Sequence, residues 1–122
     1  MEVELLSVIA NELKTLGINY EYREFTKDLT YPYMVGEYSE DNYIFENGNT
    51  SGTFFLTVFH DGDDVELIAL KESVKKHFRD FRKTSKNGGL WVSHTNSLFV
   101  ESGTENIIKM EIYLDTNYWE GT

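Results

Sequence analysis

The alternation of hydrophobic and polar positions predicts a buried strand followed by a long helix between Thr53 and Phe81. Every residue of Thr53–Phe59 is β-branched, aromatic or leucine, a composition typical of a strand buried mainly on one face. The helix expected next carries an apolar stripe at steps of three and four residues, formed by Leu67, Leu70, Val74, Phe78 and Phe81. Such a stripe needs a partner, and the sheet that contains Thr53–Phe59 is the expected one.

The acidic turn between these two elements favours a helix cap over a metal site. Asp63 is the expected N-cap, and Glu66 follows three residues later, as a capping box requires. Asp61, Asp63 and Glu72 also match positions one, three and twelve of an EF-hand calcium loop. Position five is Val65, however, and Glu66 occupies the position that needs glycine, so we predict no metal site here.

The N-terminal half predicts one helix and two strands before Thr53. A helix is expected over Glu2–Leu16, ended by Gly17 in the left-handed conformation. Alternation over Ile18–Arg23 predicts a half-buried strand, and Tyr33–Tyr38 predicts another, with Pro32 suited to its first position. The polar segment Ser39–Gly52 is either a long loop or a protruding hairpin, with Tyr43–Phe45 as a short strand turned at Asn47–Asn49.

The C-terminal part predicts further β structure. Lys83–Gly89 has no period and is expected to be a loop, whereas Leu90–Ser93, extended by Ser97–Val100, predicts one strand. Ile108–Leu114 shows the clearest alternation in the chain and predicts the last strand. From Asn117 onward the chain is either a tail or the end of that strand.

These elements predict a single α+β domain spanning residues 1–122. Their order is helix, strand, strand, strand, helix, strand, strand, which gives about five strands. Short connections and alternating faces favour a mixed or antiparallel sheet with both helices on one face, a two-layer sandwich. No apolar run approaches the ~20 residues of a membrane helix, and the absence of cysteine and of a signal-like N-terminus favours a soluble, intracellular protein.

The net charge of −10 argues against general nucleic-acid binding, but the charges are unevenly distributed. Seven of the 11 basic residues lie on or just after the long helix: Lys71, Lys75, Lys76, Arg79, Arg82, Lys83 and Lys86. One explanation is that these cations complement the helix dipole and keep the surface solvated. The other is that this basic helix meets an acidic face of the next copy in a head-to-tail assembly.

Candidate chemistry is sparse. His60, His77 and His94 lack the close spacing of zinc ligands, and no serine lies in a nucleophile elbow. Gly88–Gly89 is not followed by the lysine and hydroxyl residue of a phosphate loop. We therefore expect neither catalysis nor a cofactor. The many aromatic residues are expected in the core, and any surplus at the surface suits a protein interface.

Short segments along nearly the whole chain resemble the small tail-terminator or tail-completion proteins of long-tailed bacteriophages and prophages. The segments are Leu16-Gly17-Ile18, Tyr20-Glu21-Tyr22, Tyr31-Pro32-Tyr33-Met34-Val35, the acidic Asp41-Asn42 loop, the strand Phe54–Phe59, Gly88-Gly89-Leu90-Trp91-Val92-Ser93, the strand Ile107–Leu114 and Tyr118-Trp119. The resemblance implies an α+β virion protein without catalytic activity. It would be assembled in the bacterial host cytoplasm as a ring, commonly a hexamer, that ends the tail tube and joins it to the head.

On that basis the partners would be further copies of the chain, the tail tube protein and a neck or head-completion protein. The residues expected at these interfaces are Lys75, Lys76, Arg79 and Arg82 on the basic side and Glu40, Asp41, Tyr43 and Glu46 in the acidic segment. Three alternatives stay open: a head-completion or minor capsid protein of the neck, an acidic immunity- or antitoxin-like binder that masks a basic partner, and a small-molecule-binding or enzymatic domain.

Overall fold

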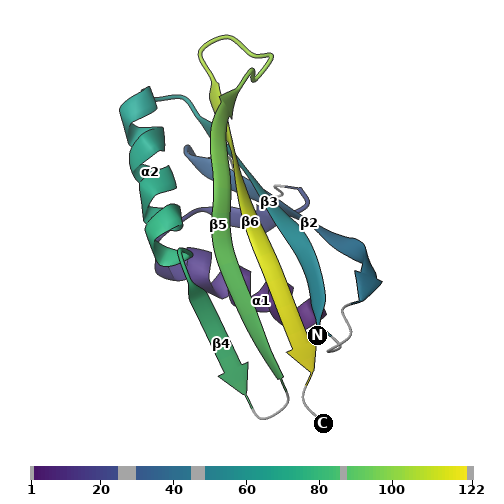
Figure 1. Ribbon diagram of the computed structural model, residues 1–122. Coiled ribbons are helices and arrows are strands. Elements are labelled where there is room, and N and C mark those ends of the chain that lie inside the picture. The colour runs from purple at the N-terminus through teal and green to yellow at the C-terminus, as the bar shows by residue number, and fades with distance from the viewer. Residues whose placement is uncertain (1, 25–29, 45–48, 86–87, 121–122) are drawn as a thin grey trace.

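Two helices and six strands make up the part of the chain that the structure describes, which is residues 2–24, 30–44, 49–85 and 88–120 of a computed structural model. In chain order the elements are α1 (Glu2–Thr15), β1 (Tyr20–Tyr22), β2 (Tyr33–Ile44), β3 (Thr50–His60), α2 (Asp64–His77), β4 (Phe81–Ser85), β5 (Gly88–Val100) and β6 (Ile108–Glu120). The strands form one curled sheet (Figure 1). The predicted α+β class is confirmed.

The sheet has the order β1-β2-β3-β6-β5-β4, so β3 and β6 lie at its centre. Neighbouring strands are antiparallel except β1 and β2, which are parallel, and the sheet is therefore mixed. It follows that β1, β2, β6 and β4 run in one direction and β3 and β5 in the other. The edge strands are β1, which is only three residues long, and β4.

The core lies between the helices and one face of this sheet. Phe54, Leu56 and Val58 alternate along β3 and are fully buried. They belong to one cluster with residues of α1 and α2 and of the neighbouring strands, among them Leu5, Ile9, Leu13, Leu67, Val74, Phe78, Ile112 and Leu114. The residues between them, such as Phe55 and Thr57, lie on the opposite side, which we call the open face.

The predicted roles of Gly17 after the first helix and of Asp63 as the N-cap of the second are confirmed, with one added contact. Gly17 has φ of +77° after α1, and the Asp63 carboxylate accepts a hydrogen bond from the Glu66 amide at 3.0 Å as the N-cap of α2. The Glu66 side chain lies 2.8 Å from Nε2 of His60, which is buried at the end of β3. This contact ties the strand directly to the helix that follows it.

The predicted extent of the second helix was wrong at Phe81. The helix ends at His77, where the amide of the capping residue Phe78 donates to the carbonyl of Val74 at 2.9 Å, and Phe81 begins β4. The ring of Phe81 still packs 5.5 Å from that of Phe78. Phe81 therefore fits the apolar spacing of the helix although it belongs to a strand. This strand, β4, was not predicted from the sequence.

Two predicted loops are largely strand. For Ser39–Gly52 the structure agrees with the hairpin alternative in part: β2 runs without a break to Ile44, with no separate short strand from Tyr43, and β3 begins at Thr50. Phe45 and most of the predicted turn at Asn47–Asn49 lie outside the described residues. Within Lys83–Gly89, residues 83–85 pair with residues 88–90 of β5. Leu90–Ser93 and Ser97–Val100 form one strand with an irregular register between His94 and Asn96, and β6 continues to Glu120.

Truncation of Phe54 should destabilise the fold far more than truncation of Phe99. Phe54 is fully buried between the rings of Tyr22 and Tyr38, each 6.0 Å away, whereas Phe99 is 45% exposed. Urea unfolding followed by circular dichroism should show that Phe54→Ala lowers the free energy of unfolding by about 3–5 kcal/mol. Phe99→Ala should lower it by about 0.5 kcal/mol or less. Equal losses would contradict this assignment of the core.

Candidate assembly surfaces

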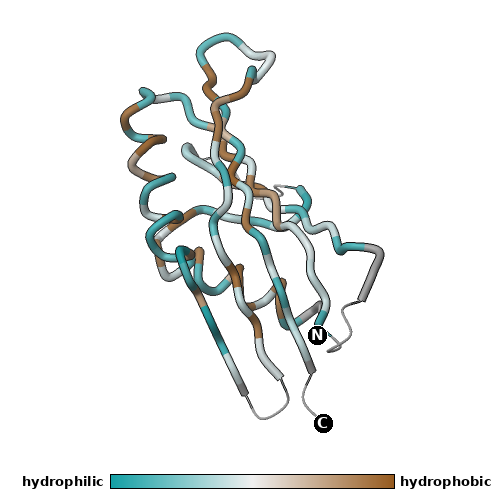
Figure 2. The backbone as a smooth tube through the Cα atoms, in the orientation of Figure 1, coloured by the Kyte–Doolittle hydropathy of each residue, from teal (hydrophilic) through white to brown (hydrophobic). Residues whose placement is uncertain are grey.

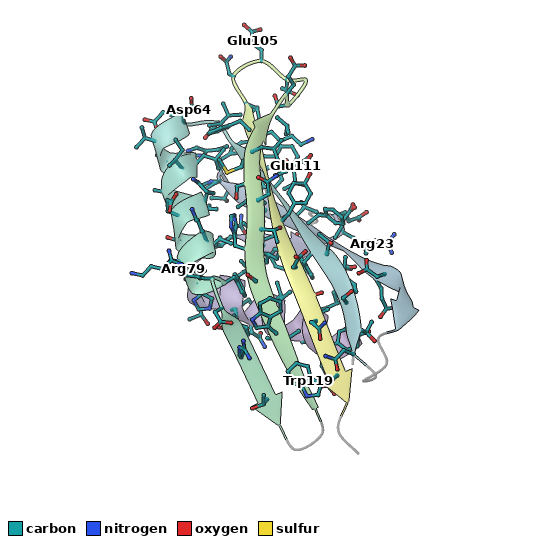
Figure 3. All side chains as sticks on the ribbon, viewed as in Figure 1. Arg23, Asp64, Arg79, Glu105, Glu111 and Trp119 are labelled. Carbon is teal, nitrogen blue, oxygen red and sulfur yellow. The ribbon has the colours of Figure 1, made fainter. Side chains whose placement is uncertain are left out.

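One edge of the sheet is basic. β4 forms this edge, pairs on one side with β5, and carries the exposed residues Arg82 and Lys83. Arg79, in the turn just before β4, is also exposed and points away from the sheet (Figure 3). Figure 2 shows β4 as a mainly hydrophilic strand. We call Arg79, Arg82 and Lys83 the basic edge.

The opposite side of the sheet is acidic. In the described residues β1 pairs with Met34–Gly36, and β2 extends well beyond this short strand. The extension carries the exposed residues Glu37, Glu40 and Asp41, which we call the acidic edge. Figure 1 shows the end of β2 and β4 on opposite sides of the molecule. The chain thus presents two different edges of opposite charge.

The four cations predicted as one basic patch are divided by the fold. Lys75 and Lys76 lie on α2, where Lys76 is exposed and Lys75 is half-buried and close enough to His94 to lower the pKa of that residue. Arg79 lies beyond the helix, and Arg82 lies on β4 opposite Trp91, on the open face. Arg82 is therefore separated from the two lysines by the sheet.

Arg82 is held in place on the open face by Asp80 and Trp91. Its Nε donates to Asp80 Oδ1 at 3.1 Å, and the guanidinium carbon lies 5.9 Å from the centre of the Trp91 ring. The Trp91 indole N–H donates to the same oxygen at 2.6 Å. The hydrogen bonds from Trp91 and then from Arg82 lower the pKa of Asp80. Because the pair is exposed it adds little stability, but it orients the arginine at the edge.

The predicted acidic residues are only partly free for a partner. Glu40 accepts a hydrogen bond from the hydroxyl of Tyr118, and Asp41 accepts one from Ser51. Burial, together with the bond to Glu40, raises the pKa of Tyr118. Tyr43 lies on β2, but its side chain is not among the described parts of the structure. Glu46 lies outside the described residues. Glu37 was not among the predicted interface residues. The alternation of side chains along β2 places it on the open face.

The open face carries a row of aromatic residues. Tyr33 stacks on Phe59 with ring centres 5.0 Å apart, and the Lys109 ammonium lies 5.6 Å from the Phe59 ring. Phe55 and Tyr113 meet edge to face at 5.4 Å. The indole of Trp119 covers Gly89 so closely that a Cβ there would lie 2.4 Å from the ring. These contacts half-bury the aromatic groups, and in the described part of the chain both helices pack on the other side of the sheet.

Exposed apolar residues near one end of the molecule were also missed from the sequence. Val65 and Ile68 on α2 are 72% and 40% exposed, and Leu98 and Phe99 on β5 are 39% and 45% exposed. α2 begins and β5 ends at the same end of the molecule (Figure 1). Large exposed apolar side chains of this kind suit contact with another protein.

The described residues do not bring together a group of potential metal ligands. No group of three or more potential ligand side chains occurs among them, and the histidines have separate partners: His60 with Glu66, His77 with Glu12 at 2.7 Å and His94 with Ser97 at 2.6 Å. An open depression of about 770 Å³ is lined by Leu16, Gly17, Ile18, Asn19, Thr30, Tyr31, Pro32, Leu70 and Ser73. Among these described lining residues, those that titrate or carry a hydroxyl are Tyr31, Thr30 and Ser73. Within the described part of the chain, neither helix is long and apolar enough to cross a membrane.

Comparison of the chain with protein-family models and with curated proteins found no match. The function is therefore inferred from the sequence pattern and from the surfaces described above.

Replacement of His94 should reduce the loss of stability in acid. Burial, followed by Lys75 and Lys71, lowers the pKa of His94, whereas Glu72 acts in the opposite direction more weakly. The folded protein therefore binds this proton less readily than the unfolded chain, so the stability that depends on neutral His94 is complete above about pH 6.5 and is lost as the pH falls through the folded pKa.

Urea unfolding at about pH 7.5 and about pH 5 measures this difference, because groups shared by both proteins cancel. The wild type should lose more free energy of unfolding between the two pH values than His94→Gln. Equal losses would show that the folded environment of His94 does not disfavour its protonation.

Proposed function

We propose that this chain is a structural virion protein in the neck of a long-tailed phage or prophage, where it forms a ring that terminates the tail tube and joins the tail to the head. The observation that carries the proposal is the pair of oppositely charged edges on opposite sides of the sheet. The α+β fold is also the class that the resemblance to tail-terminator proteins implies.

A closed ring of identical subunits needs two different, complementary patches on each subunit. The basic edge and the acidic edge have this property, since a rotation that brings one beside the other can be repeated around an axis. The net charge of −10 makes copies repel each other on average, so a local match of opposite charges would select one relative orientation.

The resemblance adds the finer assignments. The ring is a hexamer, and its partners are the tail tube protein on one side and a neck or head-completion protein on the other. The exposed apolar residues Val65 and Ile68 on α2, with Phe99 on the same side of the sheet, offer a contact for one of these partners. The role requires no catalytic group and no cofactor.

Deletion of the gene from the parent phage or prophage should separate heads from tails. Without a terminator the tube has no defined end, so electron microscopy of the lysate should show free heads and tails of abnormal length. Tails of normal length that fail to join would place the protein on the head side of the neck. Wild-type particles would contradict the phage-neck function and favour the acidic binder.

Reversal of charge at the basic edge should block complementation of that deletion. Arg79→Glu/Lys83→Glu replaces two exposed cations of the basic edge, and the control Ser7→Glu/Lys14→Glu/Thr104→Glu replaces exposed residues away from both edges. Each variant changes the net charge from −10 to −14, so a general charge effect would be the same for both. Plaque titre should fall at least tenfold for the first variant alone, and equal titres would contradict a role for the basic edge.

A further inference from the structure

We propose that the start of α2 and the end of β5 together bind a cationic segment of another protein, in which apolar side chains lie between lysines or arginines. The apolar part of this surface consists of Val65 and Ile68 on α2 and Phe99 on β5, which we call the apolar patch. The identity of the partner, a tail or neck protein, rests on the proposed function. The chemistry that recognises it comes from the surface itself.

The three side chains of the apolar patch lie on one side of the sheet. Phe99 pairs with Met110, which is buried in the core with residues of both helices, so Phe99 points to the side on which the helices pack. Val65 and Ile68 are three residues apart and therefore share one side of α2. Leu98 precedes Phe99 and points to the open face, so it does not belong to the patch.

Ile68 and Phe99 lie at the same height along the molecule. The Phe78 carbonyl, at the C-cap of α2, accepts a hydrogen bond from the His94 amide of β5 at 2.9 Å. From this contact α2 leads back to Ile68 over about 15 Å and β5 leads on to Phe99 over about 16 Å, at the usual rise per residue of each element. The two paths run in the same direction, because α2 begins and β5 ends at the same end of the molecule (Figure 1).

The side of α2 that bears Ile68 faces β5. Lys71 and Lys75 follow Ile68 at steps of three and four residues, and both are close enough to His94 on β5 to lower its pKa. The apolar patch therefore extends from the helix to the strand as one surface. Its members are exposed by 72%, 40% and 45% for Val65, Ile68 and Phe99.

The same end of the molecule is acidic. Residues 61–70 and 98–108 contain no lysine or arginine. Asp64 at the start of α2 and Glu105 in the loop after β5 both lie at this end (Figure 3). The six carboxylates of the two segments belong to Asp61, Asp63, Asp64, Glu66, Glu101 and Glu105, and all six residues are exposed.

The fold accounts for only part of this acidity. Asp63 caps α2, Glu66 contacts His60, and Asp64 complements the dipole at the first turn of the helix. Glu101 and Glu105 lie in the loop between β5 and β6, which has no helix to cap. Neither forms an ion pair with a cation in the described part of the chain. Their charge is thus available to a partner.

The charge beside the apolar patch determines the kind of partner. A molecule that covers the patch gains from the removal of apolar surface from water, but it also comes close to the carboxylates. A second copy seated on the same patch would bring like charges together, and an anionic membrane would be repelled for the same reason. The basic edge of another copy has the right charge, but its aromatic residue, Phe81, is packed against Phe78. A cationic segment with apolar side chains satisfies both requirements.

Binding of a model peptide tests the apolar patch. The probe is a short, fluorescently labelled amidated peptide in which pairs of lysines alternate with pairs of leucines, and anisotropy gives its affinity at physiological salt. Ile68→Ser and Phe99→Ser should each weaken binding about fivefold, because each removes an apolar contact. Leu98→Ser is the matched control, since Leu98 is 39% exposed on the opposite face, and it should bind as the wild type does.

Neutralisation of carboxylates tests the acidic part of the surface. Asp64→Asn/Glu105→Gln should weaken binding of the same peptide about tenfold. The control Glu4→Gln/Asp115→Asn also removes one exposed aspartate and one exposed glutamate, at sites away from this end, and brings the net charge from −10 to the same −8. The control should weaken binding far less. Equal losses would show that the peptide senses only the overall charge and would overturn the proposed surface.

Thermal melting identifies variants that fail to fold, and Val65→Ser offers a further position if Ile68→Ser or Phe99→Ser melts early. Equal peptide binding by folded Phe99→Ser and Leu98→Ser overturns the apolar patch as a docking surface. Analytical ultracentrifugation tests the other occupant: a wild-type dimer that Phe99→Ser abolishes would overturn the cationic partner in favour of a second copy.

The phage deletion separates this inference from the proposed function. If heads separate from tails but the patch variants bind the peptide normally, the neck function stands and the docking surface is overturned. If peptide binding depends on the patch but the deletion leaves wild-type particles, the docking surface is supported and the neck function is overturned.

Discussion

The backbone ladder between β3 and β6 is the interaction on which the rest of the structure depends. Eleven residue pairs, from Thr50 with Tyr118 to His60 with Ile108, join the two strands in continuous register. Because side chains alternate across a sheet, this register sends one set of residues to the helices and the other to the open face. The other strands pair on either side of β3 and β6, so the same register also determines which side chains lie at the two edges of the sheet.

The residues that were placed correctly from the sequence are those whose local chemistry permits one answer. Val58 and its neighbours suit a strand, Asp63 suits a helix N-cap, and Gly17 suits the left-handed conformation. Phe81 was misplaced because its ring satisfies the helical spacing from Phe78 while its backbone pairs with Val92, a contact that only the tertiary fold supplies. The polar end of β2 was left ambiguous because an exposed strand lacks the apolar alternation that marks a buried one.

The charged surfaces, too, were only partly predictable from the sequence. Counting charges along the chain identified a basic segment and an acidic one, but helix, turn and strand distribute the basic residues over both faces of the sheet. Arg82 illustrates this point, since its contacts with Asp80 and Trp91 lie on the side away from Lys76. Which charges share an edge depends on strand order, and strand order depends on pairings between residues far apart in the sequence.

The placement of the aromatic residues has a practical consequence. The chain has two tryptophans, and both Trp91 and Trp119 lie half-buried on the open face. Indole emission depends on the polarity around the ring, so the natural fluorescence of this protein reports on that one face. Any molecule that settles there would change the spectrum, whereas a molecule bound on the helix side would leave it largely unaltered. Binding to the open face can therefore be followed by tryptophan fluorescence without an added label.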